Sequence, residues 1–161
     1  MKNIHYIKEI LIIVSLGISL GFVRNYFLSE PLTLYKHKKV LNSIAGTSIP
    51  NILDEPMSID IDLAYHLFSN QSLFIDARDS GDYDEEHILN SINIPYEEFE
   101  MFEDVILDLD PKQPVIIYCS GGECELSMHL GDVLYDEFEF EKVLIFEAGY
   151  PAWKEMSYPV E

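Results

Sequence analysis

The sequence predicts an α/β domain with a mostly parallel sheet, preceded by an apolar N-terminal segment. Short apolar runs alternate with helical patterns from residue 57 onward, which is typical of strands joined by helices. The β-branched run at residues 115–117 is set off by Pro114, as expected of a buried central strand. A separate apolar run covers residues 10–23, so a membrane-spanning helix is predicted before the domain.

The apolar segment has the features of a membrane anchor. With its flanks, the run at residues 10–23 approaches the roughly 20 residues that a bilayer requires. Tyr6 and Tyr26 lie where aromatic side chains favour the membrane interfaces. A cleaved signal peptide is the alternative, but Arg24 and its neighbours leave no small-x-small cleavage site after the run. We therefore expect residues 1–30 to be an uncleaved single-pass anchor, with the side of the membrane left open.

The rest of the chain divides into a linker and one domain. Residues 31–56 are mixed in composition and punctuated by proline and glycine, so they are interpreted as a linker with a short helix near residues 38–44. The domain is expected over residues 57–161, a length typical of a single core.

The elements of the domain follow from its apolar patterns. Leu63, Leu67 and Phe68 share one helical face, with Asp60 or Asp62 placed to cap the helix. After it the sequence predicts, in order, a strand at 73–75, a short polar helix at 82–87, a strand at 92–94, a helix over 97–109, the strand at 115–117, a helix from 126, a strand at 143–146 and a short final helix.

The stretch after the central strand carries the candidate nucleophile. The strand ends at Cys119, and Ser120, Gly121 and Gly122 form a tight turn before the next helix. Sites in open α/β sheets lie at the carboxyl ends of strands. Backbone N–H groups in such a turn can converge on one point and favour a thiolate there. Cys119 is therefore either a nucleophile or an inert buried cysteine at a strand end.

Charge and composition exclude several classes. The net charge is −19, and from Val40 onward 27 acidic residues face four basic ones. Such a surface repels nucleic acid and small anions, so no nucleic-acid partner is expected. The two cysteines cannot form a disulfide framework, although they can form a local redox pair. The histidines show no metal-ligand spacing, so neither a metal nor a cofactor is expected.

Four separated segments match one known family. They are Phe-Ile-Asp-Ala-Arg at 74–78, Y-x-x-x-H-I-x-x-S-x-N-I-P at 83–95, Ile-Tyr-Cys at 117–119 and Glu-Ala-Gly-Tyr-Pro-Ala-Trp at 147–153. In this order they resemble a single rhodanese-like domain, from about Met57 to Val160. The resemblance implies a mostly parallel five-stranded sheet flanked by helices and a cysteine, Cys119, that carries sulfur as a persulfide. The C-x-G-x-x-C loop resembles that of a membrane-anchored subgroup.

The active loop departs from the family's common C-x-x-G-x-R pattern. Gly122 fits the glycine position, but Cys124 stands where the arginine is expected, and Glu123 and Glu125 add negative charge. Thiosulfate is a dianion, so it is expected to be a poor donor here, and a neutral or protein-borne persulfide a better one. A cysteine phosphatase is excluded, because its C-x(5)-R loop needs arginine where this chain has Glu125.

Other residues of the loop and its surroundings receive supporting roles. Cys124 is either a resolving thiol that attacks the Cys119 persulfide or a small residue at the first turn of the helix, and both readings stay open. Asp76 and Arg78 are expected to support the structure, with Arg78 pairing with a carboxylate of residues 82–86. His87 is expected to brace its loop rather than to transfer protons.

The sequence thus favours a membrane-tethered sulfurtransferase with Cys119 as persulfide carrier and the loop Ser120, Gly121, Gly122, Glu123 and Cys124 around it. Its partners would be a sulfur donor and a thiol acceptor, either small molecules or proteins. The alternatives are a non-catalytic rhodanese-like module that binds a protein at the membrane, and a thiol–disulfide or persulfide reductase that uses both cysteines.

Overall fold

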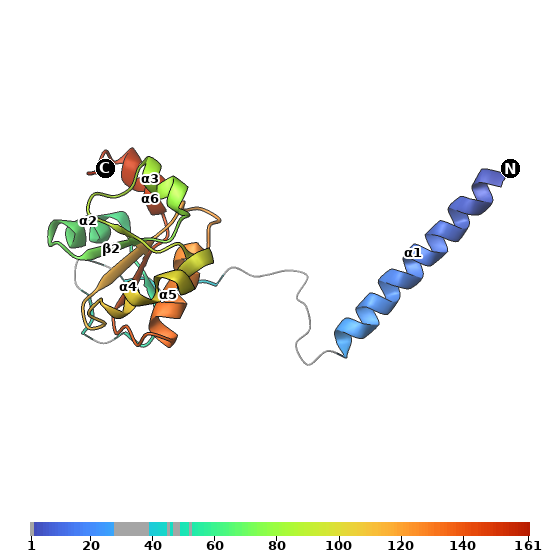
Figure 1. The fold of residues 1–161 in the computed structure, drawn as a ribbon, viewed down its shortest axis with the longest axis horizontal. Helices are drawn as coiled ribbons and strands as arrows, with labels where there is room; N and C mark the ends of the chain where they lie inside the picture. The colour runs from blue at the N-terminus through green and yellow to red at the C-terminus, as the bar shows by residue number, and fades with distance from the viewer. Residues whose placement is uncertain (1, 28–38, 45, 47–48, 52) are drawn as a thin grey trace. The chain divides into compact units, whose positions relative to one another are not determined.

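The computed structural model describes residues 2–27, 39–44, 46, 49–51 and 53–161 (Figure 1). The chain forms two separate units, an N-terminal helix and a compact unit that begins at Lys39. Residues 39–44 contain no helix, so the short helix expected near residues 38–44 is wrong for the described part of that range. Instead, Leu41 and Ile44 are buried against the domain, and this burial draws the segment into the core.

The N-terminal unit is the helix α1, Lys2–Tyr26. Its segment Tyr6–Tyr26 has 21 residues and a mean hydropathy of 1.9, which is long and apolar enough to cross a membrane. The described apolar side chains of this segment are exposed rather than packed in a protein core. A signal sequence at the N-terminus has the same features, so the helix alone does not distinguish an anchor from a signal.

A parallel five-stranded sheet forms the centre of the domain and confirms the predicted fold class. The strands are β1 (Met57–Ser58), β2 (Leu73–Asp76), β3 (Ile92–Asn93), β4 (Val115–Tyr118) and β5 (Val143–Phe146). Their order across the sheet is β1-β5-β4-β2-β3, and every pair is parallel. The strand that leads to Cys119 is therefore central, as the β-branched run predicts.

Helices cover both faces of the sheet (Figure 1). The helical elements are α2 (Ile61–Ser69), α3 (Ser80–Glu85), the 3₁₀ segment η1 (Tyr96–Phe102), α4 (Glu103–Leu107), α5 (Leu126–Asp136) and α6 (Gly149–Glu155). Along β4 the side chains alternate between two cores. Ile117 packs with Leu130 of α5, whereas Ile116 packs with Trp153 of α6. The Asp60 side chain caps α2, as expected, by accepting a hydrogen bond from the Leu63 amide at 2.8 Å.

Three elements differ from the sequence prediction. β1 has only two residues and no periodicity, so its pairing with β5 could not be seen in the pattern. The polar helix α3 begins at Ser80 rather than at residue 82, because Asp79 caps it. The continuous helix over 97–109 is wrong: the segment is split into η1 and α4, with a kink at Glu98. Five carboxylates within residues 97–104 repel one another, which disfavours one regular helix.

Candidate active site

Cys119 follows β4 directly, at the carboxyl end of the sheet. Its side chain is 1 % exposed. Its carbonyl oxygen accepts a hydrogen bond of 2.9 Å from the backbone N–H of Tyr150, at the start of α6. The candidate nucleophile is therefore fixed between a central strand and the turn that follows β5, and a substrate can reach its sulfur only if the loop moves.

Two glycines interlock the loop with that turn. Gly121 has φ +70°, and a Cβ at this position would lie 2.3 Å from the carbonyl oxygen of Ala148. Gly149 has φ +66°, and its Cβ would lie 2.4 Å from the carbonyl oxygen of Cys119. Each position therefore needs glycine both for its left-handed backbone and for space. Gly149 and Tyr150, in the last family-like segment, therefore pack against the backbone of the cysteine loop.

The two thiols of the loop are reduced and lie against one another. The Cys119 Sγ donates to the Cys124 carbonyl oxygen at 3.6 Å and lies 3.4 Å from the Ser127 Oγ. Burial raises the pKa of the Cys124 thiol, and a hydrogen bond with the Cys119 side chain raises it further. Backbone hydrogen bonds from Leu126 and Ser120 oppose this rise in pKa. Cys124 is therefore a half-buried thiol that receives backbone hydrogen bonds from the loop, whereas the sequence predicts that the loop amides converge on Cys119.

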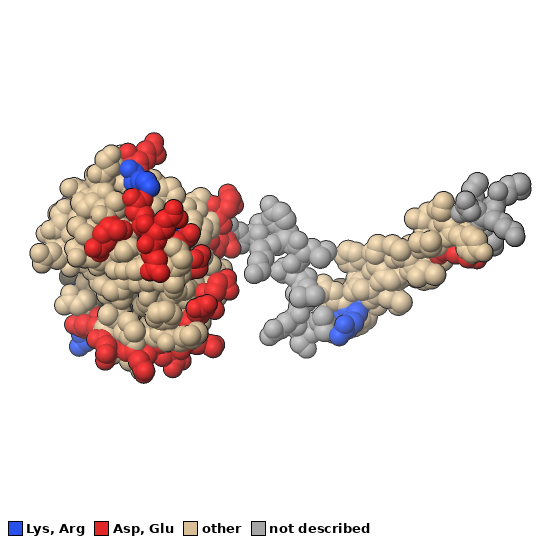
Figure 2. Space-filling view, turned by 45° about the horizontal axis from the view of Figure 1, so that its top comes forward, with Lys and Arg blue, Asp and Glu red and all other residues tan. Residues whose placement is uncertain are grey.

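The rest of the loop carries no positive charge. Ser120 and Glu123 are exposed, and Glu125 lies 3.8 Å from His129 as its nearest described ion-pair partner. Three basic side chains of the domain are held by carboxylates elsewhere: Lys39 by Asp132, Arg78 by Asp76, and Lys154 by Glu86. Acidic side chains are spread over the face of the domain seen in Figure 2. The loop therefore presents acidic rather than basic side chains, at Glu123 and Glu125.

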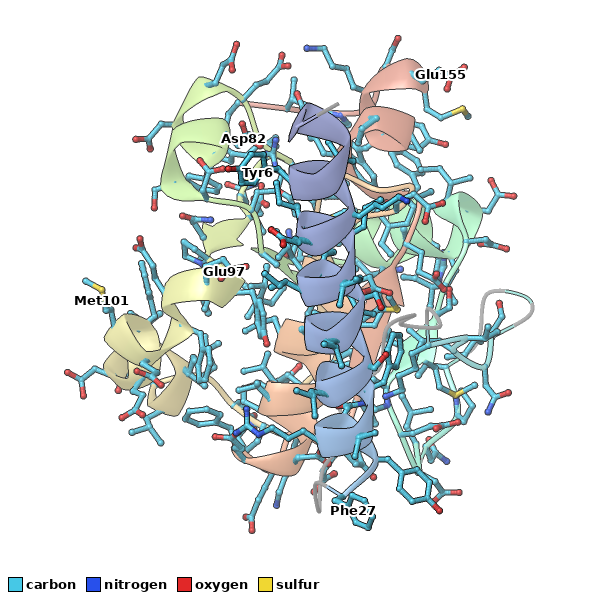
Figure 3. The ribbon with its side chains drawn as sticks, turned by 90° about the vertical axis from the view of Figure 1, so that its right-hand side faces the viewer. Tyr6, Phe27, Asp82, Glu97, Met101 and Glu155 are labelled. Carbon is cyan, nitrogen blue, oxygen red and sulfur yellow. The ribbon has the colours of Figure 1, made fainter. Side chains whose placement is uncertain are left out.

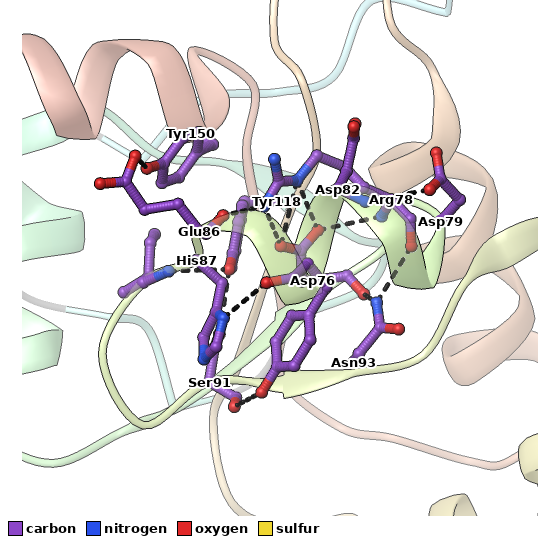
Figure 4. A network of polar contacts seen from close by, with 12 residues as sticks. Asp76, Arg78, Asp79, Asp82, Glu86, His87, Ser91, Asn93, Tyr118 and Tyr150 are labelled. Atoms are coloured by element: carbon purple, nitrogen blue, oxygen red, sulfur yellow. Dashed lines mark hydrogen bonds and ion pairs between the residues drawn. The ribbon is translucent and has the colours of Figure 1, made fainter. Parts of the chain in front are cut away.

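Asp76 and Arg78 form a buried ion pair at the carboxyl end of β2 (Figure 4). The Asp76 carboxylate accepts from the Arg78 backbone amide at 3.0 Å and from its guanidinium at 2.6 Å. Burial lowers the pKa of Arg78, but the hydrogen bond and charge of Asp76 outweigh it, so the pKa lies above its ordinary value. The nearby carboxylate that pairs with Arg78 is that of Asp76 and not one of residues 82–86, from which Arg78 contacts the backbone carbonyl of Glu86.

Tyr150 connects this ion pair to the reactive loop. The Arg78 guanidinium carbon lies 4.5 Å from the centre of the Tyr150 ring, a cation–π contact. The Tyr150 hydroxyl donates to the Glu86 carboxylate, which Lys154 also contacts. Burial and this hydrogen bond raise the pKa of Tyr150. Because the Tyr150 amide also holds the Cys119 carbonyl, the network fixes the backbone beneath the nucleophile.

His87 contacts a part of the domain away from the two thiols. Its Nδ1 lies 2.7 Å from the Tyr83 carbonyl oxygen, and its ring stacks on Tyr83 at 3.7 Å between centres. Its Nε2 lies 3.4 Å from a carboxylate oxygen of Glu161. His87 therefore links α3 to the C-terminal segment, and the structure does not bring it together with the thiols.

Sequence reasoning missed two contributors to the site. Ser127 contacts the Cys119 sulfur through its buried hydroxyl, and the backbone amide of Tyr150 holds the Cys119 carbonyl oxygen. Tyr150 is also buried, and its hydroxyl donates to the Glu86 carboxylate. The spacing of Ser127, one residue into the helix after the loop, is the signal that could have pointed to it.

Comparisons with known proteins agree with this geometry. The model of the rhodanese-like domain family matches residues 61–156, more than half of the chain. Thiosulfate sulfurtransferase GlpE of Coxiella burnetii is 28% identical over 92 residues, which cover 56% of this chain and 80% of that protein.

Solved structures show the same fold. The BH2092 protein from Bacillus halodurans has a TM-score of 0.53 and 26% identity, covering 63% of this chain and 74% of its own. The rhodanese-like domain of the Anabaena Alr3790 protein has a TM-score of 0.51 and 22% identity, covering 63% and 76%. The matching family model, together with the sheet order and the cysteine loop after β4, shows that this chain belongs to the rhodanese-like family.

Proposed function

We propose that the domain is a sulfurtransferase that carries sulfane sulfur as a persulfide on Cys119. The observation that supports this most is the position of Cys119, which ends the central strand in a chain of a family that includes sulfurtransferases. Its backbone is held by Tyr150 and its sulfur is surrounded by Cys124 and Ser127. These contacts fix one reactive atom at the end of the sheet where α/β enzymes place their chemistry.

The proposed reaction has two displacements. The Cys119 thiolate attacks the outer sulfur of a donor R–S–SH, the S–S bond breaks, and the donor leaves as R–S⁻. A second thiolate then attacks the outer sulfur of Cys119–S–SH, takes that sulfur, and releases Cys119 as a thiolate. No electrons are gained or lost overall, so no cofactor is needed. Because Cys119 is almost fully covered, each displacement requires the loop to open.

The proposed donor is a thiol-borne persulfide rather than thiosulfate. The loop side chains are uncharged or acidic, and Cys124 occupies the place of the arginine that other family members offer to an anion. A neutral persulfide avoids the repulsion that a dianion meets at this surface. The name of the Coxiella relative refers to thiosulfate, so the donor is the part of the proposal that most needs a direct test.

Intact-mass and peptide-mass measurements on the detergent-solubilised full chain test the proposal. After a low-molecular-weight persulfide is added, we expect a gain of about 32 Da, one sulfur atom, on Cys119. The Cys124→Ser variant should load as well, whereas Cys119→Ser should not. Thiosulfate at the same concentration should load far less. Absence of the adduct with every donor would contradict the proposal and favour the non-catalytic, protein-binding role.

A second candidate is a persulfide reductase that uses both cysteines. The contact of the Cys119 Sγ with the Cys124 carbonyl oxygen at 3.6 Å favours it, because it places Cys124 beside the sulfur that it would attack. The Cys124 thiolate would attack the inner sulfur of Cys119–S–SH, form the Cys119–Cys124 disulfide, and release HS⁻. An external thiol would then reduce the disulfide. Sulfide release in wild type but not in Cys124→Ser, with a mass loss of about 2 Da for the disulfide, would establish this route.

We also propose that α1 anchors the domain to a membrane. The exposed apolar side chains of Tyr6–Tyr26 and their length support this role. The full chain should stay with membranes after alkaline carbonate extraction, and its N-terminal peptide should be recoverable from the mature protein. Recovery of a chain that lacks residues 1–27 would instead identify a cleaved signal.

A further inference from the structure

A cavity of about 380 Å³ opens beside the reactive loop. Its walls come from the segments that follow β2 and β3 and from the first residue of α5. Ala77 and Pro95 form buried apolar parts of the wall, and Leu126 adds a partly buried one. The volume is within the range of small-molecule and side-chain binding sites.

The cavity is coupled to the active site through its wall. The Ala77 amide donates to the carbonyl oxygen of Tyr118, the residue before Cys119, at 2.9 Å. Leu126 lies two positions after Cys124 and packs in the same apolar cluster as Ala77 and Cys119. A ligand in this cavity would therefore contact Ala77 and Leu126, which pack in one apolar cluster with Cys119.

The charged groups of the cavity all have the same sign. Its lining includes Asp79, Glu97 and Glu98, whose side chains are exposed, and none of the described lining residues is basic. The Asp79 side chain also caps α3 by accepting a hydrogen bond from the backbone amide of Asp82. Figure 3 shows Glu97 on η1 and Asp82 on α3 on the same side of the domain. The cavity thus combines an apolar wall with a carboxylate rim, which suits a short aliphatic chain that ends in a cation.

We propose that this cavity binds an ammonium or guanidinium group carried by the sulfur-exchanging substrate, and that the site selects cationic thiols. This inference rests on the proposed sulfurtransferase function and names its substrate class. In the acceptor step, the thiolate of a cationic thiol attacks the outer sulfur of the Cys119 persulfide. It leaves as R–S–SH, and Cys119 is restored as a thiolate. The cation in the cavity places the attacking sulfur near the loop.

Three small acceptors of different charge test the selectivity. Cysteamine is cationic, 2-mercaptoethanol is neutral and 3-mercaptopropionate is anionic. Their intrinsic reactivities differ, so each acceptor is compared between wild type and the double variant Glu97→Gln, Glu98→Gln in the detergent-solubilised full chain. The second-order rate of sulfur transfer from the loaded Cys119 should fall on the order of fivefold for cysteamine, stay constant for mercaptoethanol and rise for mercaptopropionate.

A matched control removes the same charge from the opposite end of the sheet. Glu139 and Glu141 line another cavity, at the amino end of β5. The variant Glu139→Gln, Glu141→Gln should leave the three rates in their wild-type ratio. Added salt should reduce the cysteamine preference of wild type and have little effect on the Glu97→Gln, Glu98→Gln variant.

Peptide acceptors distinguish the source of the cation. Rates for acetyl-Cys-Lys-amide and acetyl-Cys-Glu-amide are measured with the same variants. A charge effect confined to the peptides identifies a protein thiol as acceptor, and one confined to cysteamine identifies a small thiol. Equal changes for all charges, with Cys119 still loading normally, would overturn the cavity inference alone. Failure of Cys119 to load would instead overturn the sulfurtransferase proposal.

Discussion

The segments that follow β2 and β4 leave neighbouring strands at the same end of the sheet, yet they are stabilised in opposite ways. At the end of β2, Asp76 and Arg78 form a buried ion pair in which the guanidinium of Arg78 donates hydrogen bonds to the carboxylate of Asp76. After β4, Cys119 and Cys124 form a loop without a cation, shaped by two glycines against residues 148–150. An ion pair stabilises the segment at the end of β2, whereas close backbone contacts at two glycines shape the cysteine loop.

The difference teaches where this domain can change its chemistry. A buried pair tolerates no loss of one partner, because the remaining charge stays in a poorly solvated place. The loop depends on glycine at Gly121 and Gly149, while the side chains at Ser120, Glu123 and Cys124 are exposed or half-buried. An arginine position can therefore become Cys124 without disturbing the supporting network.

The largest effect should come from breaking the support. Arg78→Met leaves Asp76 buried and unpaired, so the free energy of unfolding should fall by about 3–5 kcal/mol. Lys154→Met removes an exposed partner of Glu86 and should cost about 1 kcal/mol or less. Urea unfolding of both variants measures the difference. Equal losses would show that the buried pair is no stronger a constraint than the surface pair.

The next largest effect should come from the turn that shapes the loop. In Gly149→Ala the new Cβ meets the Cys119 carbonyl and Gly121, so we expect a loss of about 2–4 kcal/mol together with slower persulfide loading. Gly122→Ala is the matched control. It has a similar positive φ but open space, and should cost about 1–2 kcal/mol. If both variants load sulfur equally well, the interlock does not hold the loop.

A smaller effect is expected where the two regions are joined. Tyr150→Phe removes the hydroxyl that donates to Glu86 but keeps the ring on Arg78, so the loss should be about 1–2 kcal/mol. Tyr65→Phe is the control, because Tyr65 contacts its neighbours through its ring. Thermal unfolding compares the two. A Tyr65 loss as large as that of Tyr150 would count against the hydroxyl bridge.

The smallest effect concerns pH. Hydrogen bonds from Lys154 and Tyr150 lower the pKa of Glu86. A carboxyl with a lowered folded pKa stabilises the fold above its unfolded pKa, and this contribution disappears as pH falls through the folded value. The melting temperature of wild type should therefore decline more steeply below about pH 4.5 than that of Glu86→Gln. If the melting temperatures of the two proteins fall in parallel with pH, Glu86 does not contribute to the loss of stability in acid.

Much of this architecture could be predicted from residue patterns. The β-branched run ending at Cys119, the cap at Asp60 and the last strand at residues 143–146 each combine periodicity with a clear boundary, and the structure confirms them. The family-like segments placed Asp76 and Arg78 together at a strand end. Periodicity and boundary residues are enough to predict a segment's structure where its conformation depends mainly on its own sequence.

Other features depend on contacts between distant segments and left no such pattern. The two residues of β1 form a strand because they pair with β5, and Leu41 is buried because it packs against the domain. The partner of Arg78 was assigned to residues 82–86, since sequence distance does not show that the nearest carboxylate is already buried beside it. Likewise, nothing in the spacing shows that Cys124 would cover Cys119.

The strand order also has a consequence for how the chain folds. β4 lies between β2 and β5, and the turn that interlocks with the cysteine loop follows β5, so the loop acquires its shape only after β5 has paired with β4. Before then, Cys119 and Cys124 lie five positions apart on an open chain, where short loops close within about 100 ns. An oxidant present before β5 has docked would thus meet two thiols that approach one another freely, whereas afterwards Gly149 and Tyr150 hold the backbone of the loop.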